Sequence, residues 1–181
     1  KNGSKHIIRG GFKMNPELLF KIGISFDDFV NKDDDSYKEK TLEVYNNINF
    51  SEELLSRVKS IDKKINVLIC AEMWCPDCMI NVPVVEKMRD LNKHIHISIV
   101  GKEENVDFFK KYSLNEIIKI PTFLFFDEKF NLLGSFIERP QYVKEVSNSG
   151  NQPAVIVTMR KYRKGEYTEE TLKDILKIIG Q

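Results

Sequence analysis

Cysteine is scarce in this sequence: its 181 residues contain three, and their spacing does not form a disulfide framework. Such sparse use of cysteine favours a reducing compartment, and we expect the protein to be cytoplasmic. Long apolar runs are also missing, because no stretch approaches the ~20 residues that span a bilayer. The first dozen residues lack the apolar region of a signal peptide, so no membrane partner is expected.

An excess of charge of one sign is absent as well. The sequence has 28 lysines and arginines against 27 aspartates and glutamates, a formal net charge of +1. This balance gives no electrostatic reason to expect a nucleic-acid partner. Basic residues cluster only at residues 160–164, which we interpret as solvated surface or, alternatively, as a contact for an anionic partner.

The chemistry of the sequence is concentrated in one short segment, Trp74-Cys-Pro-Asp-Cys78. It follows the apolar run 65–71, which predicts a buried strand, and precedes a helical pattern over residues 79–91. Two cysteines between a strand and a helix are typical of a redox motif. The positive end of the helix dipole stabilises a thiolate, so we expect a lowered pKa for Cys75. Pro76 suits the first turn of a helix, where no N–H is needed.

The two cysteines have different predicted roles. Cys75 would attack a substrate disulfide, and Cys78, about one helical turn further on, would attack the mixed disulfide and release the reduced product. Half of a zinc site and a pair of inert thiols are the alternatives. A structural zinc site needs four ligands, and few other candidates exist (Cys70, His6, His94, His96). We expect Cys70 to be a small buried hydrophobe, the two strand histidines to be polar residues, and no metal to bind.

The hydrophobic periodicity predicts an α/β architecture. Helices are expected over residues 16–30, 37–46 and 51–61, then the strand 65–71 and a motif helix to about residue 92, which Pro83 should bend. A strand over 95–100, a helix over 105–112, an antiparallel hairpin of strands 122–126 and 132–137, and helices over 141–146 and 168–179 follow. The segment 155–164 is compatible with either a strand or a helix.

The length suits a single domain with a substantial core. We expect this domain to span residues 14–181, with a core over about 51–146. Residues 14–50 would form an N-terminal helical arm, and residues 147–181 a C-terminal extension. Residues 1–13 are Gly-rich and basic, unlike the rest, and we interpret them as an added remnant or a disordered segment.

From about residue 51 to residue 146 the sequence resembles the thioredoxin superfamily. The motif Trp74–Cys78, Pro83 five residues after it, and Ile120-Pro121-Thr122 before the third strand match the family pattern. The resemblance implies a thioredoxin fold, in which a βαβ unit is followed by a ββα unit and helices flank the central sheet. It also implies a substrate-binding loop beside Cys75, with Pro121 in the cis form, Ile120 pairing with substrate through its backbone, and Thr122 next in sequence.

The residues around the motif depart from thioredoxin itself. Pro76-Asp77 resembles the pair found in thioredoxin-related proteins and in bacterial thioredoxin-like proteins with extra N-terminal helices, where thioredoxin has Gly-Pro. Asp77 should raise the pKa of Cys75 by like-charge repulsion, or interact with the helix dipole as a first-turn acid; both roles are open. Ile69 stands where thioredoxin has a buried Asp that assists proton transfer, and either Glu72 or water is expected to replace it.

The motif and the resemblance together predict a thiol–disulfide oxidoreductase that contributes to cell redox homeostasis. It would reduce protein or small-molecule disulfides through Cys75 and Cys78, with Trp74 shielding the thiols and contacting substrate or, alternatively, lying at the edge of the core. No cofactor is expected, and electrons would come from a thioredoxin-reductase-type partner or a low-molecular-weight thiol. The alternatives are a protein-binding module with little redox activity and a glutaredoxin-like reductase driven by a small thiol.

Overall fold

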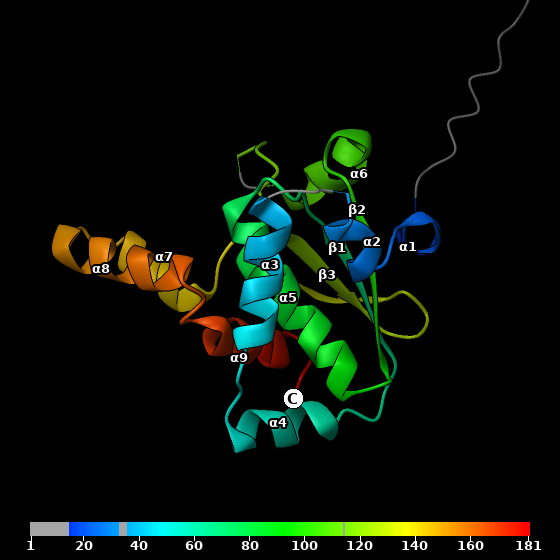
Figure 1. The fold of residues 1–181 in the computed structure, drawn as a ribbon. Helices are drawn as coiled ribbons and strands as arrows, with labels where there is room; N and C mark the ends of the chain where they lie inside the picture. The colour runs from blue at the N-terminus through cyan, green and yellow to red at the C-terminus, as the bar shows by residue number, and fades with distance from the viewer. Residues whose placement is uncertain (1–14, 33–35, 114) are drawn as a thin grey trace, which may run out of the picture.

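The computed structural model describes residues 15–32, 36–113 and 115–181, so the prediction for residues 1–13 lies outside the described residues. The described residues contain a four-stranded sheet in the order β2-β1-β3-β4 (Figure 1). Its strands are β1 (Ile65–Cys70), β2 (Ile95–Val100), β3 (Thr122–Phe126) and β4 (Leu132–Ile137). β1 is parallel to β2 and antiparallel to β3, and β3 forms an antiparallel hairpin with β4. The predicted thioredoxin fold is confirmed.

The two central strands of the sheet are its most apolar segments. Every residue of β1 and β3 is buried, as expected for strands that are covered on both faces. β4 lies at an edge, and its first residues, Leu132 and Leu133, are exposed. Because β1 ends at Cys70, shortly before the motif, the rigid centre of the sheet positions the two cysteines.

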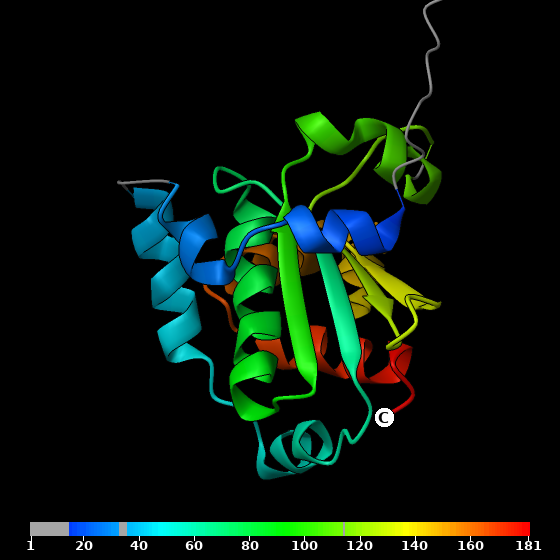
Figure 2. The same cartoon turned by 90° about the vertical axis from the view of Figure 1, so that its right-hand side faces the viewer.

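Helices cover both faces of this sheet. α5 (Pro76–Leu91) and α9 (Thr168–Ile178) lie on one face, and α1 (Pro16–Ile22) crosses β1 and β2 on the opposite face (Figure 1 and Figure 2). α3 (Ser36–Asn47) packs along the outer side of α5, and α4 (Glu52–Lys59) contacts α5 and α9. The motif helix α5 is therefore enclosed, and most of its residues are buried.

The single helix predicted over residues 16–30 is wrong, because α1 stops early and a second short helix, α2 (Phe26–Val30), follows. Between the two helices, Ile24 forms an isolated antiparallel bridge with Ile99 of β2. Gly23 passes so close to β2 that a Cβ atom at this position would overlap a strand side chain. The chain leaves the helix to make backbone hydrogen bonds with the sheet edge, and helical periodicity does not reveal such a tertiary effect.

The segment 155–164, for which the sequence allowed a strand or a helix, lies almost entirely in α8 (Gln152–Arg163). The side chain of Asn151 caps this helix, and Pro153 lies in its first turn. These two start signals outweigh the β-branched residues that follow them. α8 packs against α7 (Gln141–Ser147), which agrees with the predicted helix over 141–146.

The predicted helix over 105–112 is divided into η1 (Glu103–Asn105), α6 (Val106–Phe109) and η2 (Lys110–Tyr112).

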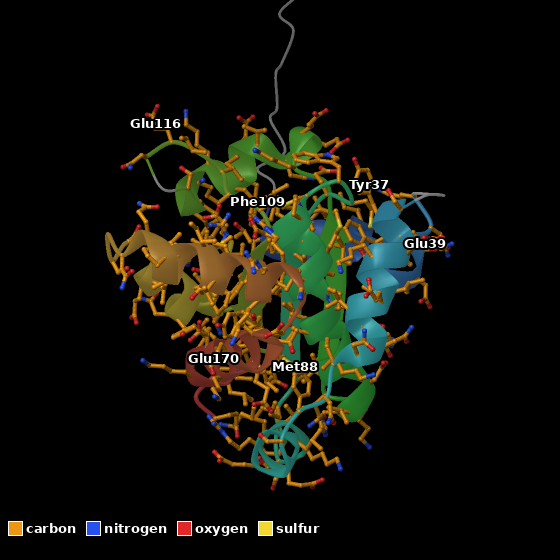
Figure 3. All side chains as sticks on the ribbon, turned by 60° about the vertical axis from the view of Figure 1, so that its left-hand side comes forward. Tyr37, Glu39, Met88, Phe109, Glu116 and Glu170 are labelled. Atoms are coloured by element: carbon orange, nitrogen blue, oxygen red, sulfur yellow. The ribbon has the colours of Figure 1, made fainter. Side chains whose placement is uncertain are left out.

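Figure 3 shows Phe109 and Met88 in the interior, where each is 1% exposed, and Glu39 and Glu116 at the periphery. Within the part of the chain that the structure describes, no helix has the length and apolar character needed to cross a membrane.

Candidate active site

The dithiol motif connects the end of β1 to the start of α5. Cys75 is the N-cap residue of this helix and has an extended backbone, and Pro76 is the first helical residue. The helix therefore begins before Met79, the first residue of the predicted helical pattern, because Pro76 fixes a backbone angle that suits a first turn. Cys78 lies in that first turn, and both cysteines carry free thiols.

Cys75 lies against the loop that precedes β3. Its thiol donates a hydrogen bond to the carbonyl oxygen of Ile120, with a sulfur–oxygen distance of 3.5 Å. The peptide bond between Ile120 and Pro121 is cis. Thr122 begins β3, and its hydroxyl donates to the carbonyl oxygen of Lys119 at 2.6 Å. The segment expected to bind substrate is thus beside Cys75.

The two thiols differ in acidity. The pKa of Cys75 is lowered to about 7, chiefly by its hydrogen bond with Cys78; burial opposes this, and the backbone N–H groups of Cys78 and Asp77 reinforce it. Cys78 is fully buried, and burial raises its pKa well above the usual value. At pH 7 the Cys75 thiol is therefore about half ionised, whereas Cys78 stays protonated.

Asp77 is held between two arginines. Its carboxylate accepts hydrogen bonds from Nε and Nη2 of Arg139 at 3.1 and 3.2 Å, and from Nη1 of Arg163 at 2.9 Å. The Asp77 carboxylate raises the pKa of Cys75, in agreement with the predicted like-charge repulsion. The hydrogen bond from Cys78 lowers the same pKa and is the larger effect. The ion pairs restrain the Asp77 side chain, which is 8% exposed.

The two arginines are the residues that the sequence did not reveal. Arg139 and Arg163 follow Asp77 by 62 and 86 residues, and no motif connects the three positions. Arg163 belongs to the basic run 160–164, which the sequence suggested was solvated surface. The only available signal was the basic character of that run, because the ion pair depends on how α8 packs beside α5.

A chain of buried polar side chains lies behind Asp77 and connects α5 to the C-terminal helices. The side-chain nitrogen of Asn81 is within hydrogen-bonding distance of three oxygens: the carbonyls of Asp77 and Glu138, both at 3.0 Å, and the hydroxyl of Tyr162 at 2.7 Å. The hydroxyl of Thr171 in α9 donates to Oδ1 of Asn81 at 2.7 Å. Buried polar groups that find partners in this way fix the geometry of the elements they join.

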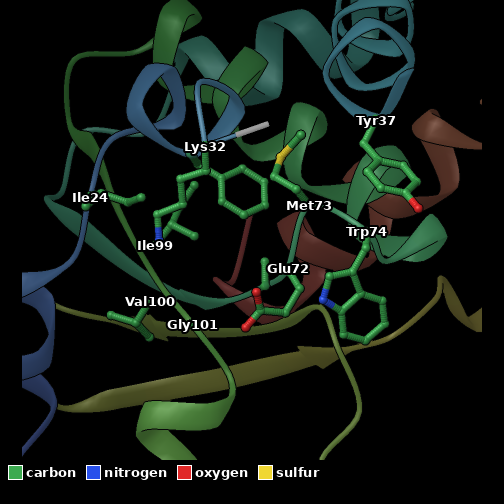
Figure 4. Close-up of a pocket in the computed structure, with 11 residues that line it drawn as sticks. Ile24, Lys32, Tyr37, Glu72, Met73, Trp74, Ile99, Val100 and Gly101 are labelled. Atoms are coloured by element: carbon green, nitrogen blue, oxygen red, sulfur yellow. The ribbon is translucent and has the colours of Figure 1, made fainter. Parts of the chain in front are cut away.

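A cavity of about 240 Å³ opens beside Trp74, between the N-terminal arm, the residues before the motif and the end of β2 (Figure 4). Trp74 is 57% exposed, so its ring is at the surface and not within the core. Glu72 also lines the cavity, and its Oε1 atom accepts the backbone N–H of Lys102 at 2.7 Å. This carboxylate therefore bonds to the segment that follows β2, and Cys78 receives its hydrogen bond from the backbone N–H of Glu72.

Of the residues considered for a zinc site, His6 lies outside the described residues, and Cys70, His94 and His96 do not belong to a cluster that could hold a metal ion. In the ranges that the structure describes, no group of three or more His, Cys, Asp or Glu side chains is arranged to hold a metal ion. Cys70 is fully buried in β1, and burial raises its pKa to about 12. His96 is exposed in β2, which agrees with the polar role expected for it.

Comparisons with known proteins find one protein family and several individual proteins that are similar to this chain. Residues 23–154 match the protein family described as Thioredoxin. The thioredoxin of Mycoplasmopsis pulmonis is 31% identical over 68 residues, which cover 35% of this chain and 62% of that protein. The crystal structure of a protein of unknown function from Pseudomonas aeruginosa has a TM-score of 0.82 at 31% identity, with 92% of this chain and 98% of that chain covered. An HIV epitope-scaffold gives a TM-score of 0.82 at 30% identity, with the same coverage.

A mixed sheet with a dithiol at a strand–helix junction, and a cis proline beside it, defines the class of thioredoxin-like proteins. The family match covers residues 23–154, and the chain belongs to the thioredoxin family. Membership supports a redox role at the level of the family. The alignment with the Mycoplasmopsis thioredoxin spans only 62% of that protein, so it does not assign particular substrates or partners to this chain.

Proposed function

We propose that this protein is a thiol–disulfide oxidoreductase that acts as a reductase. The proposal rests chiefly on the surroundings of Cys75, which is the N-cap of α5, has a pKa lowered to about 7, and touches the carbonyl oxygen of Ile120. A substrate segment that pairs with the backbone of Ile120 would bring its own disulfide to this sulfur. The exposed ring of Trp74 offers an apolar surface for the same segment.

The reaction transfers two electrons from the dithiol to a substrate disulfide. The Cys75 thiolate attacks one substrate sulfur, the substrate S–S bond breaks, and the other substrate sulfur leaves as a thiolate that takes a proton from water. Cys78 then loses its proton and attacks the sulfur of Cys75, which releases the second substrate thiolate. The protein ends with a Cys75–Cys78 disulfide, and the substrate ends with two thiols.

Deprotonation of Cys78 is the demanding step, because burial raises the pKa of this thiol. Ile69 offers no carboxylate to accept the proton, and the carboxylate of Glu72 is bonded to the backbone of Lys102. Of the two proton acceptors that the sequence suggested, we therefore assign the role to water.

The reduced dithiol would be restored by a separate electron donor, either a thioredoxin-reductase-type protein or a low-molecular-weight thiol. Substrates would be disulfides of proteins or small molecules, and the setting would be the cytoplasm, where such a protein contributes to redox homeostasis. Family membership supports this type of partner in general terms.

The reduction potential of the Cys75–Cys78 pair tests the proposal. The protein is equilibrated in graded dithiol buffers, free thiols are alkylated, and the oxidised fraction is determined by mass spectrometry. We expect a value closer to the roughly −270 mV of thioredoxin than to the roughly −120 mV of the oxidant DsbA. A value near the latter would indicate an oxidant, and failure to form the intramolecular disulfide would favour a binding module.

Single cysteine variants separate the two roles. With insulin as the disulfide substrate and dithiothreitol as the electron donor, Cys75→Ser should abolish turnover. Reduced Cys78→Ser, mixed with insulin after the dithiothreitol has been removed, should accumulate a mixed disulfide on Cys75. Cys70→Ala, which removes a cysteine outside the motif, should retain activity. Turnover supported by glutathione alone would instead indicate the glutaredoxin-like alternative.

A further inference from the structure

The dithiol motif carries a negative charge of its own. Asp77 lies between Cys75 and Cys78 in sequence, and an ionised carboxylate near a thiol opposes formation of a second negative charge. The Asp77 carboxylate indeed acts to raise the pKa of Cys75. A thiolate nucleophile at this position therefore benefits from positive charge that offsets Asp77.

Two guanidinium groups supply that charge. Arg139 binds both oxygens of the Asp77 carboxylate, and Arg163 binds Oδ1 at 2.9 Å. We call these three residues the arginine clamp; its two cations and one anion give a net charge of +1. The side chains are 24%, 37% and 8% exposed for Arg139, Arg163 and Asp77, so solvent screens their mutual interaction only in part.

The other charged groups around the clamp largely cancel one another. Oε1 of Glu138 lies 3.8 Å from Nη2 of Arg139, but it also lies 3.4 Å from Nζ of Lys119. Lys144 of α7 interacts with Glu138 and with Asp174 of α9, and burial lowers its pKa. The excess positive charge of the clamp is therefore retained next to the motif.

The structure fixes the clamp from several elements at once. Arg139 follows β4, whereas Arg163 is the last residue of α8. The neighbouring Tyr162 is fully buried, stays neutral because burial raises its pKa, and bonds to Asn81 of α5. Arg163 lies beyond residues 23–154, the part of the chain that matches the family, so it belongs to the C-terminal extension of this chain.

The geometry points to a positioning role for Arg139 and Arg163: they hold and neutralise the Asp77 carboxylate, and thereby favour the thiolate of Cys75. The C-terminal extension is then part of the active site, because α8 contributes one of the two cations. This inference rests on the proposed function, since it names residues that adjust the nucleophile of that reaction.

Two variants that break the same ion pair provide the test, because they change the local charge in opposite directions. Arg163→Gln leaves the carboxylate with one arginine, and it should raise the pKa of Cys75 by about one unit. Asp77→Asn leaves both arginines without their counter-charge, and it should lower that pKa by about one unit. A contact that served only to hold α8 in place would shift the pKa in the same direction in both variants, or in neither.

The measurement is the rate of alkylation of Cys75 by iodoacetamide as a function of pH, in the full chain, with circular dichroism to verify folding. At pH 6, Arg163→Gln should react about tenfold more slowly than the unmodified protein, and Asp77→Asn about fivefold faster. Arg163→Lys keeps the charge and should restore most of the rate. Arg89→Gln is the matched control, because Arg89 also pairs with a buried carboxylate of α5, that of Glu86, away from the motif.

Opposite shifts in Asp77→Asn and Arg163→Gln support the clamp, and equal or absent shifts overturn it. If Arg163→Gln fails to fold, Arg139→Gln replaces it, because it too should raise the pKa of Cys75 while Asp77→Asn lowers it. The outcome can be separated from that of the proposed function. If the pKa shifts are opposite but the protein reduces no disulfide, the arginine clamp is supported and the reductase proposal fails. If the protein reduces disulfides but the opposite shifts are absent, the reductase proposal is supported and the clamp fails.

Discussion

The acidity of Cys75 comes from donors that are close in sequence and are held by the start of one helix. The hydrogen bond from the Cys78 thiol is the largest favourable contribution, and the backbone N–H groups of Asp77 and Cys78 add to it. A thiolate at a helix N-terminus is stabilised by the same unsatisfied donors that bind other anions. The spacing Cys-x-x-Cys places the second thiol within reach of the first.

Replacement of Cys78 should therefore make Cys75 less acidic. In Cys78→Ala the main hydrogen bond to the thiolate is lost, and the pKa of Cys75 should rise from about 7 toward its ordinary value of 9.0. The pH at which alkylation of Cys75 is half-maximal measures this change. Cys70→Ala should leave the midpoint near pH 7, and an unchanged midpoint in Cys78→Ala would contradict the assignment of the hydrogen bond.

The site residues that could be predicted from the sequence are those whose partners are close to them in the sequence. Cys75, Cys78 and Pro76 form a contiguous motif whose chemistry can be inferred from its position between a strand and a helix. The environment of Asp77 could not be inferred, because Arg139 and Arg163 reach it only through the packing of distant elements. The sequence predicted a nucleophile at Cys75, which stays a prediction, but it gave no sign of the two arginines that bind Asp77.

At the scale of elements, strands and isolated helices were predictable, and the corner between α1 and α2 was not. Apolar runs such as β1 and β3 must be buried on both faces, so their pattern determines their structure. At residues 23–25 the helical pattern is compatible with a continuous helix, but the backbone instead pairs with β2. α8 was ambiguous because β-branched residues follow strong start signals.

The close approach of Gly23 to β2 has a measurable consequence. A Cβ atom on Gly23 would lie 2.1 Å from Oγ of Ser98 and 3.0 Å from the carbonyl oxygen of Ile99. Gly23→Ala should therefore lower the free energy of unfolding by about 1–3 kcal/mol, as overpacking in a core does. Urea denaturation monitored by circular dichroism measures this loss.

Ser98→Ala serves as the control for this prediction. Its hydroxyl is buried and finds no hydrogen-bond partner among the residues that the structure describes, so its removal should cost little stability or increase it. Because the same hydroxyl obstructs a Cβ atom at position 23, Gly23→Ala should cost less in the Ser98→Ala background. An equal cost in both backgrounds would place the strain elsewhere.

For the molecule as a whole, the unusual pKa of Cys75 couples stability to pH. The pKa of this thiol is about 7 in the folded protein and 9.0 in its ordinary state. Between these values the unfolded chain binds more protons than the folded one, so stability rises with pH, and this contribution is lost as pH falls through 7. Cys70 acts in the opposite sense above pH 9, because burial raises its pKa to about 12.

The difference in unfolding free energy between the reduced protein and Cys75→Ser isolates this effect from other titrating groups. It should grow by about 2 kcal/mol between pH 7 and pH 9, following from the two-unit pKa difference. Urea denaturation at a series of pH values under reducing conditions provides the measurement. Cys70→Ala should show no such growth below pH 9, and a flat difference for Cys75→Ser would contradict the lowered pKa.

The separation of Asp77 from its two arginines also has a consequence during protein synthesis. Arg139 and Arg163 follow Asp77 by 62 and 86 residues, so a ribosome that adds roughly 5–20 residues per second makes the dithiol several seconds before either cation. In the nascent chain the thiols therefore stand beside an unneutralised carboxylate. Cys75 acquires the electrostatic environment of the folded protein only when the last helices have been made and have docked.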